Sequence, residues 1–196
     1  MNIGEAVIAA VAPHPDVARI ELVGSRAKGC ATEWSDWDLA VWTSDFSAVF
    51  AALPELLAPL EPLFQQWDRL ADEYCWMLLL AGPLKVDLIF PDEPHAKEPP
   101  WTPEPGNIAG IDGHFWDWVW WLRGKEAAGK SELVTVELGR LFEHLLGPLG
   151  VEGPPLSLGE AVSSYRAGRN RVERRFGVAV ARDVELAVAP ALADGP

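Results

Sequence analysis

Apolar runs separated by polar turns dominate the N-terminal half of the chain. The runs that predict β-strands lie at residues 17–23, 37–42, 74–81 and 84–90. The last two flank Gly82-Pro83 and indicate a hairpin. Helix-favouring stretches at 3–12 and 46–60 accompany the strands, and Pro54 must kink or restart the second of them. The pattern predicts a strand-rich unit of about 90 residues that combines strands and helices.

The C-terminal half has apolar residues at helical spacing instead. Its predicted helices lie at residues 114–122, 132–146 and 156–176. Between the halves, residues 91–106 contain six prolines, which favours an extended connector over a helix or a central strand. The expected organisation is an α+β domain at 1–92, a Pro-rich linker at 93–107, a helical domain at 108–182 and a flexible tail at 183–196.

The net charge of the chain limits the classes of molecule that it is expected to bind. The formal net charge is −13, and residues 1–100 hold 16 acidic against 6 basic residues. Binding to long nucleic acid depends on clustered Lys and Arg, so that function is not expected, whereas a metal-chelated nucleotide brings its own positive charge. Cys30 and Cys75 lack a paired spacing, the N-terminus carries Glu5 rather than a basic segment, and no apolar run has the length of a membrane span. These features predict a cytoplasmic protein without membrane contact.

The candidate chemistry lies on the predicted strands at 17–23, 37–42 and 84–90 and on the turn that follows the first of them. The strand ending at Val23 runs into Gly24-Ser25, where glycine permits close approach of the backbone to a phosphate. Asp36 and Asp38 follow at the start of the next strand, and the alternation of a strand directs both to one face. Two adjacent carboxylates repel each other unless a cation lies between them. With Asp87 from a third strand, these acids indicate a site for one or two Mg²⁺ ions.

This set of motifs resembles the polymerase-β-type nucleotidyltransferase superfamily. The string Gly-Ser-Arg-Ala-Lys-Gly, followed by Ser-Asp-Trp-Asp-Leu-Ala-Val, is similar to its small bacterial branch, which includes aminoglycoside and lincosamide nucleotidyltransferases and the minimal nucleotidyltransferases of toxin–antitoxin pairs. The motif order covers about residues 17–90. The resemblance implies an α+β nucleotidyltransferase fold, in which helices flank a mixed sheet, followed by a C-terminal helical bundle.

The resemblance also implies roles for individual residues. Gly24 and Ser25 would hold a nucleoside triphosphate, ATP or another, and Asp36, Asp38 and Asp87 would ligate Mg²⁺. Asp87 would also help to deprotonate an acceptor hydroxyl. Contact of Arg26 and Lys28 with the triphosphate is as well supported as a role for them as solvated turn residues. Glu137 on a predicted helix is a second candidate base, against the alternative of a solvated helix face.

Two further segments of the helical half carry candidate contacts. The run from Phe115 to Trp121 holds four tryptophans within six residues, which favours a core helix with some surface left for a cleft or a homodimer contact. Asp117 within it is a candidate for an amine of the acceptor. The arginines between 166 and 175 are interpreted first as a solvated basic face, with an acidic partner or nucleotide phosphates as the alternative.

Three functions follow from these observations. The leading hypothesis is transfer of a nucleoside monophosphate, AMP from ATP, to a hydroxyl of a small acceptor resembling an aminoglycoside, as in antibiotic resistance, with release of pyrophosphate. The second is an antitoxin-like nucleotidyltransferase that modifies a partner protein. The third is a non-catalytic nucleotide-binding or scaffold module of the same fold.

Overall fold

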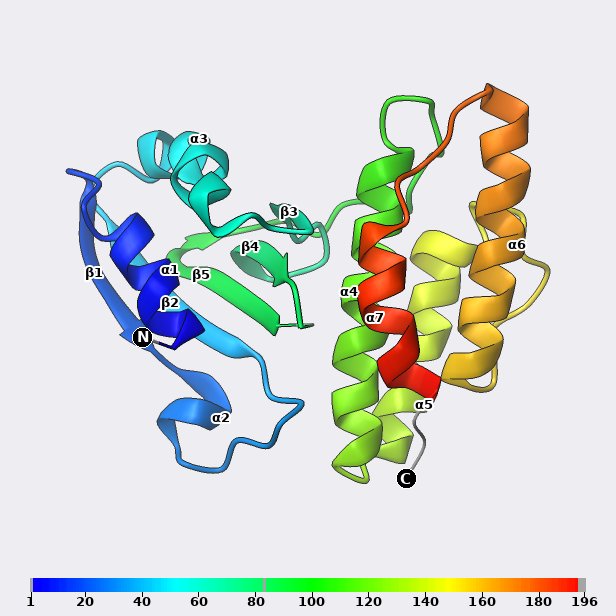
Figure 1. Ribbon diagram of the computed structural model, residues 1–196, viewed down its shortest axis with the longest axis horizontal. Coiled ribbons are helices and arrows are strands. Elements are labelled where there is room, and N and C mark those ends of the chain that lie inside the picture. Colours follow the sequence, from blue (N-terminus) through cyan, green and yellow to red (C-terminus); the bar gives the residue numbers. More distant parts are fainter. Residues whose placement is uncertain (1, 83, 194–196) are drawn as a thin grey trace. The chain divides into compact units, whose positions relative to one another are not determined.

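The computed structural model describes residues 2–82 and 84–193 and divides the chain into two compact units, Met1–Glu98 and Pro99–Pro196 (Figure 1). The N-terminal unit contains α1 (Ile3–Val11), β1 (Val17–Leu22), α2 (Gly24–Ala27), β2 (Trp37–Thr43), α3 (Phe46–Leu57), η1 (Ala58–Leu60), β3 (Phe64–Trp67), β4 (Glu73–Leu80) and β5 (Leu84–Pro94). The C-terminal unit contains α4 (Ile108–Ala127), α5 (Ser131–Leu141), the π-helical turn η2 (Phe142–Leu146), α6 (Leu158–Phe176) and α7 (Asp183–Ala193).

The strands of the N-terminal unit form one mixed sheet in the order β1-β2-β5-β4-β3. All neighbouring pairs are antiparallel except β2 and β5, which run parallel. The parallel pair aligns Asp38 with Asp87 and Leu39 with Leu88. Since aligned residues on neighbouring strands point to the same face, the register decides which side chains meet.

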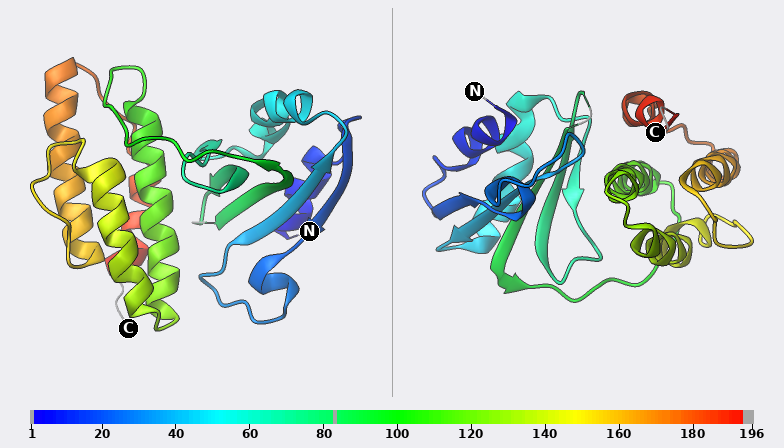
Figure 2. Two further views of the ribbon diagram at one scale, coloured as in Figure 1. Left: turned by 180° about the vertical axis from the view of Figure 1, so that it is seen from behind. Right: turned by 90° about the horizontal axis from the view of Figure 1, so that it is seen from below.

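The hydrophobic core of this unit lies on one face of the sheet. Helices α1 and α3 pack side by side on that face, as Figure 2 shows, and bury Val7, Val49 and Leu53 against Leu39 and Leu88. Helix α1 begins with a capping box in which Asn2 and Glu5 satisfy each other's backbone N–H groups. Because Leu39 and Leu88 point into this core, their neighbours Asp38 and Asp87 point to the opposite face.

The C-terminal unit is helical and buries an unusually aromatic helix. Along α4 every residue from Ile111 to Trp120 is buried, and Trp121 is half-buried. The Phe115 ring stacks on Tyr165 of α6, with ring centroids 3.7 Å apart. The aromatic run is therefore mainly a core segment. Among the described residues, no helix combines the length and the apolarity needed to cross a membrane.

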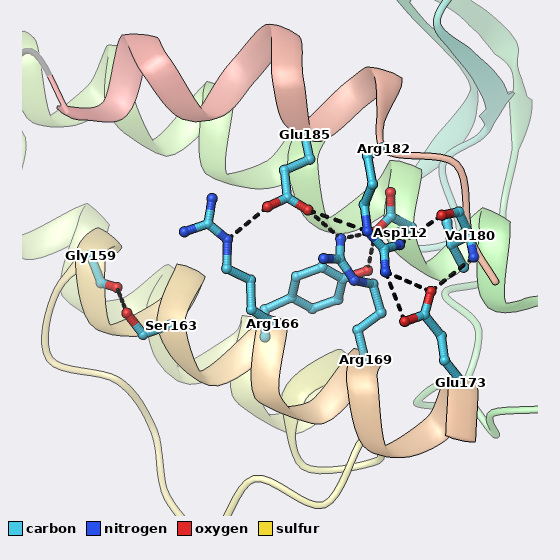
Figure 3. Close-up of polar contacts among 10 residues, drawn as sticks. Asp112, Gly159, Ser163, Arg166, Arg169, Glu173, Val180, Arg182 and Glu185 are labelled. Carbon is cyan, nitrogen blue, oxygen red and sulfur yellow. Dashed lines mark hydrogen bonds and ion pairs between the residues drawn. The ribbon is translucent and has the colours of Figure 1, made fainter. Parts of the chain in front are cut away.

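Charged side chains join α4, α6 and α7 within this unit (Figure 3). Arg169 Nη1 lies 2.9 Å from Asp112 Oδ1 and 2.6 Å from Glu185 Oε2, and the Tyr165 hydroxyl also donates to Asp112 Oδ1. Burial raises the pKa of Asp112, although hydrogen bonds from Tyr165 and Arg169 oppose this increase. Arg166 binds Glu185 from the exposed side. We call Asp112, Tyr165, Arg166, Arg169 and Glu185 the helical ion network.

The structure confirms the predicted α+β fold followed by helices and corrects several details. Residues 183–193, expected to belong to a flexible tail, form α7, which Glu185 and the buried Val184 and Val188 attach to the unit. The arginines of α6 form a solvated basic face only in part: Arg166, Arg171, Arg174 and Arg175 are exposed, whereas Arg169 is buried within the unit.

The bounds of the linker and the presence of strand β3 also differ from the expectation. Strand β5 continues through Pro91 to Pro94, where the expected linker had already begun. Beyond Ile89 the register no longer pairs β5 with β2, and the pairing with β4 is irregular between Phe90 and Pro94, so Pro91 removes no ladder hydrogen bond from a central position. The short strand β3 was not predicted, because its sequence Phe-Gln-Gln-Trp shows little apolar character.

Candidate active site

The candidate site lies where three neighbouring segments of the N-terminal unit meet. The N–H of Val23, directly after β1, donates to the Asp38 carbonyl over 2.8 Å and aligns the end of β1 with β2. Asp38 is in turn aligned with Asp87 on β5. The structure therefore brings the Gly24 turn, Asp38 and Asp87 together, as the motif order predicted.

Gly24 lies directly against the Asp38 carboxylate. Its φ is +68°, and a Cβ atom at this position would stand 1.9 Å from Asp38 Oδ2. Both the left-handed backbone and the missing side chain are thus required here. The glycine allows the backbone of α2 to pass over a carboxylate that any other residue would displace.

Asp36 lies just before β2, and its Oδ1 atom is buried. The part of the chain that the structure describes contains no group of three or more His, Cys, Asp or Glu side chains placed to hold an ion. The joint ligation of a metal by Asp36, Asp38 and Asp87 therefore stays a prediction. The residues do fit such an ion chemically, since their donors are all carboxylate oxygens, which Mg²⁺ prefers, and two of them are aligned in register.

Arg26 holds the loop before β2 rather than pointing away from it. Its Nε donates to the Asp36 carbonyl over 3.1 Å and its Nη2 to the Ser35 carbonyl over 2.6 Å. The guanidinium also stacks over the Trp37 ring, 4.2 Å from its centroid. The sequence predicted either contact with phosphate or a solvated turn residue for Arg26, and neither prediction included these bonds to the backbone. Arg26 fixes the backbone that carries Asp36.

Ser25 and Lys28 remain candidates for the triphosphate. The Ser25 carbonyl accepts the N–H of Cys30 over 3.1 Å, which closes the turn, and its side chain is half-buried. Lys28 is exposed at the end of α2. Their roles toward phosphate stay predictions.

Lys85 is a member of the site that sequence reasoning missed. It lies two residues before Asp87 on β5, so both side chains point to the same face. Lys85 Nζ donates to Asp87 Oδ1 over 2.7 Å, and only 5% of the lysine side chain is exposed. A lysine two positions before a strand carboxylate was the available signal, and it becomes informative only once the register is known.

Glu137 belongs to the C-terminal unit. It is buried on α5, not on a solvated face, and Arg140 Nη1 donates to its Oε1 over 2.7 Å. Asp117, the candidate for an acceptor amine, is also buried. The roles of Glu137 as a base and of Asp117 as an acceptor contact stay predictions.

The fold and the aligned acids of β2 and β5 agree with the class of a nucleotidyltransferase domain. Residues 7–103, about half of the chain, match the family model described as a nucleotidyltransferase domain, and this part of the chain belongs to that family. The resemblance that the motifs predicted is thereby confirmed. A search of curated protein sequences found no match.

Two solved structures are similar to the chain at low identity. One is an aminoglycoside 6-adenyltransferase from Bacillus subtilis, 11% identical, with a TM-score of 0.39 and coverage of 98% of both chains. The other is a chain of the GLD-2/RNP-8 complex, 17% identical, with a TM-score of 0.41; the match covers 70% of this chain and 43% of that one. At this level of similarity neither structure indicates an acceptor for this chain.

Proposed function

We propose that the protein transfers a nucleoside monophosphate, AMP from ATP, to a hydroxyl group of a small acceptor in a Mg²⁺-dependent reaction that releases pyrophosphate. The observation that carries this proposal is the alignment of Asp38 with Asp87 beneath Gly24. Neighbouring carboxylates favour a bound cation, and Lys85 already offsets part of their charge at Asp87. The family of the N-terminal unit supports nucleotidyl transfer as the general reaction.

The chain's own residues divide the work of such a transfer. Asp36 and Asp38 would hold Mg²⁺, which supplies charge neutralisation at the phosphates when it is bound. The turn at Gly24 and Ser25 would bind the triphosphate through its backbone N–H groups and the serine hydroxyl. Because Gly24 has no side chain, this turn lies close to Asp38, where the metal ion would be held. Asp87 would accept the proton of the acceptor hydroxyl, through the carboxylate oxygen that Lys85 does not bind.

The charge distribution supports a cationic acceptor. The first hundred residues carry 16 acids and 6 bases, so the field around the site attracts cations and repels polyanions. An aminoglycoside-like compound carries several amines beside its hydroxyl groups and suits this field.

Pyrophosphate release tests this function directly. Each of the four ribonucleoside triphosphates is offered with Mg²⁺, with and without pooled aminoglycosides, to the wild type and to the Asp38→Asn variant. Acceptor-dependent release with ATP that disappears in the variant is the expected result. If no acceptor supports release, the small-molecule proposal is wrong, and intact-mass analysis of co-expressed proteins then tests modification of a protein partner.

A further inference from the structure

Strand β1 forms one edge of the sheet, and in the described part of the chain no strand pairs with its outer side (Figure 1). The edge of a sheet presents backbone N–H and C=O groups that a strand of another chain can bind. Arg19, Glu21 and Leu22 are exposed here, and Leu22 is an exposed large hydrophobic residue, at 37%. The outer edge of β1 is therefore a surface on which a further strand can pair.

The hydrogen bonds between β1 and β2 determine which residues face this outer edge. The N–H of Val23 donates to the carbonyl of Asp38, which is the next residue in register on β2. In an antiparallel pair, such hydrogen-bonded positions alternate with positions whose backbone groups point away from the neighbouring strand. Glu21 is thus bonded to β2 in the same way as Val23, whereas Leu22 and Ile20 direct their N–H and C=O groups to the outer edge.

Two opposite charges flank Ile20 on this strand. Arg19 Nη1 lies 3.0 Å from Glu21 Oε1, and about half of each side chain is exposed. The Arg19 guanidinium also lies over the Trp42 ring, 3.7 Å from its centroid, whereas Ile20 packs against the core on the other face of the sheet. The strand therefore carries a cation and an anion placed symmetrically about a residue whose backbone faces the outer edge.

We propose that β1 pairs antiparallel with β1 of a second copy of this chain, about a two-fold axis at Ile20. In this register the two Ile20 residues exchange N–H···O=C bonds, because these groups face the outer edge. Arg19 of each copy lies opposite Glu21 of the other, at the positions where side chains approach most closely, so two intermolecular charge pairs form. A two-fold axis at Arg19 or at Glu21 would place like charges opposite each other. Backbone direction and side-chain charge thus select the same register.

The extent of the pairing limits the affinity of the dimer. The same register places the exposed Leu22 opposite Ala18, a small exposed residue, of the second copy. The strand pair ends there, because the register of β1 is irregular between Val17 and Arg19. A short strand pair and a net charge of −13 on each copy both make the dimer weak and reversible. The inference is independent of the proposed function, since no residue of β1 belongs to the candidate site.

Reversal of the two charges tests the proposed register. Sedimentation velocity is measured on the full chain from about 5 to about 500 µM at about 0.15 M salt, where a Debye length of about 8 Å screens the net charges. The wild type should dimerise as its concentration increases. Arg19→Glu and Glu21→Arg should each raise the dimer Kd at least about tenfold, because each places like charges opposite one another. An equimolar mixture of the two variants should dimerise as the wild type does, since opposite charges then face each other.

Two matched controls separate the register from the net charge. Glu55→Arg on α3 and Arg174→Glu on α6 change the net charge by the same amounts at exposed positions outside β1, and each should leave the Kd within about twofold. A wild type that stays monomeric at the highest concentration overturns the inference. A wild-type dimer that the β1 variants leave unchanged, or a mixture of the folded variants that stays monomeric, overturns it as well.

Amide hydrogen exchange of the wild type tests the backbone contact without any variant. The Ile20 N–H faces the outer edge, so its exchange should slow by at least about threefold between the lowest and the highest protein concentration. The Glu21 N–H is bonded to β2 in the monomer, and its exchange should change less. An Ile20 exchange rate that does not depend on concentration overturns the inference. This measurement decides the question if circular dichroism shows that either β1 variant is unfolded.

Discussion

Buried or half-buried charges occur in both units, but their signs are arranged in opposite ways. In the helical ion network, Arg169 lies between Asp112 and Glu185, so each charge has a neighbour of opposite sign. In the sheet unit, two acids, Asp38 and Asp87, lie side by side in register, and Lys85 pairs with Asp87. Alternating charges offset part of the cost of their burial, whereas adjacent like charges add to it. The first arrangement fastens helices, and the second indicates a site that a ligand completes.

The largest expected effect follows from removal of one carboxylate charge in the sheet unit. Asp38→Asn keeps the shape of the side chain and removes a proposed metal ligand, so pyrophosphate release should fall by roughly 10³-fold, about 4 kcal/mol of activation free energy. The free energy of unfolding is measured beside activity, because loss of transfer by a variant that stays folded assigns the effect to the site. Urea unfolding beside the activity assay measures both. A destabilised but active variant would contradict the comparison.

Removal of one charge from the helical ion network should lower the free energy of unfolding. Arg169→Met leaves Asp112 and Glu185 without their shared cation, and the free energy of unfolding should fall by about 3–5 kcal/mol. Tryptophan fluorescence during urea unfolding reports this loss. The exposed Arg174 on the same helix is the matched control, and Arg174→Met should change stability by less than about 0.5 kcal/mol.

A double variant shows whether the cost arises from the unpaired acid. Asp112→Asn combined with Arg169→Met removes both charges and should recover part of the stability that Arg169→Met loses. Additive losses would mean that Asp112 and Arg169 do not act as a pair.

Two glycines with the same backbone conformation allow a narrower test of the site. Gly24 and Gly29 both have φ +68°, but only at Gly24 would a Cβ atom meet another group, the Asp38 carboxylate. Gly29→Ala should therefore cost about 1 kcal/mol of stability from backbone strain and leave transfer intact. Gly24→Ala should cost about 2–3 kcal/mol and also lower kcat/KM for ATP by roughly 10²-fold. Equal behaviour of the two variants would show that the contact with Asp38 is unimportant.

The sequence predicted the motif-bearing part of the fold well because its signals are local. Gly24-Ser25, Asp38 and Asp87 each follow or interrupt a short apolar run whose length and flanking turn residues favour a strand. Parallel pairing of β2 with β5 then aligns the two acids. The family match confirms the interpretation of the domain. The catalytic and metal-binding roles of the individual residues remain predictions.

Long-range contacts explain what the sequence could not predict. The ion pair of Lys85 with Asp87 is local, two residues apart on β5, but nothing in the sequence shows that the lysine is buried there. The bonds of Arg26 to the loop before β2 join residues nine and ten positions apart. Helix α7 begins in a segment of weak pattern, and it is held by Glu185 through arginines of α6. Such contacts require the tertiary structure, since propensity alone does not place them.

The smallest expected effect concerns the edge of the helical unit, at the ion pair of Glu173 with Arg182. Arg182 Nη2 donates to both Glu173 oxygens, and this contact lowers the pKa of Glu173. Because the pKa is lower in the folded state, the pair stabilises the protein at pH values above the unfolded pKa, and this stability is lost as the pH falls through the folded pKa. Glu173→Gln should therefore lower the free energy of unfolding by about 1–2 kcal/mol at about pH 7 and by less at about pH 3. A deficit of equal size at both pH values would show that the pair contributes through packing and not through charge.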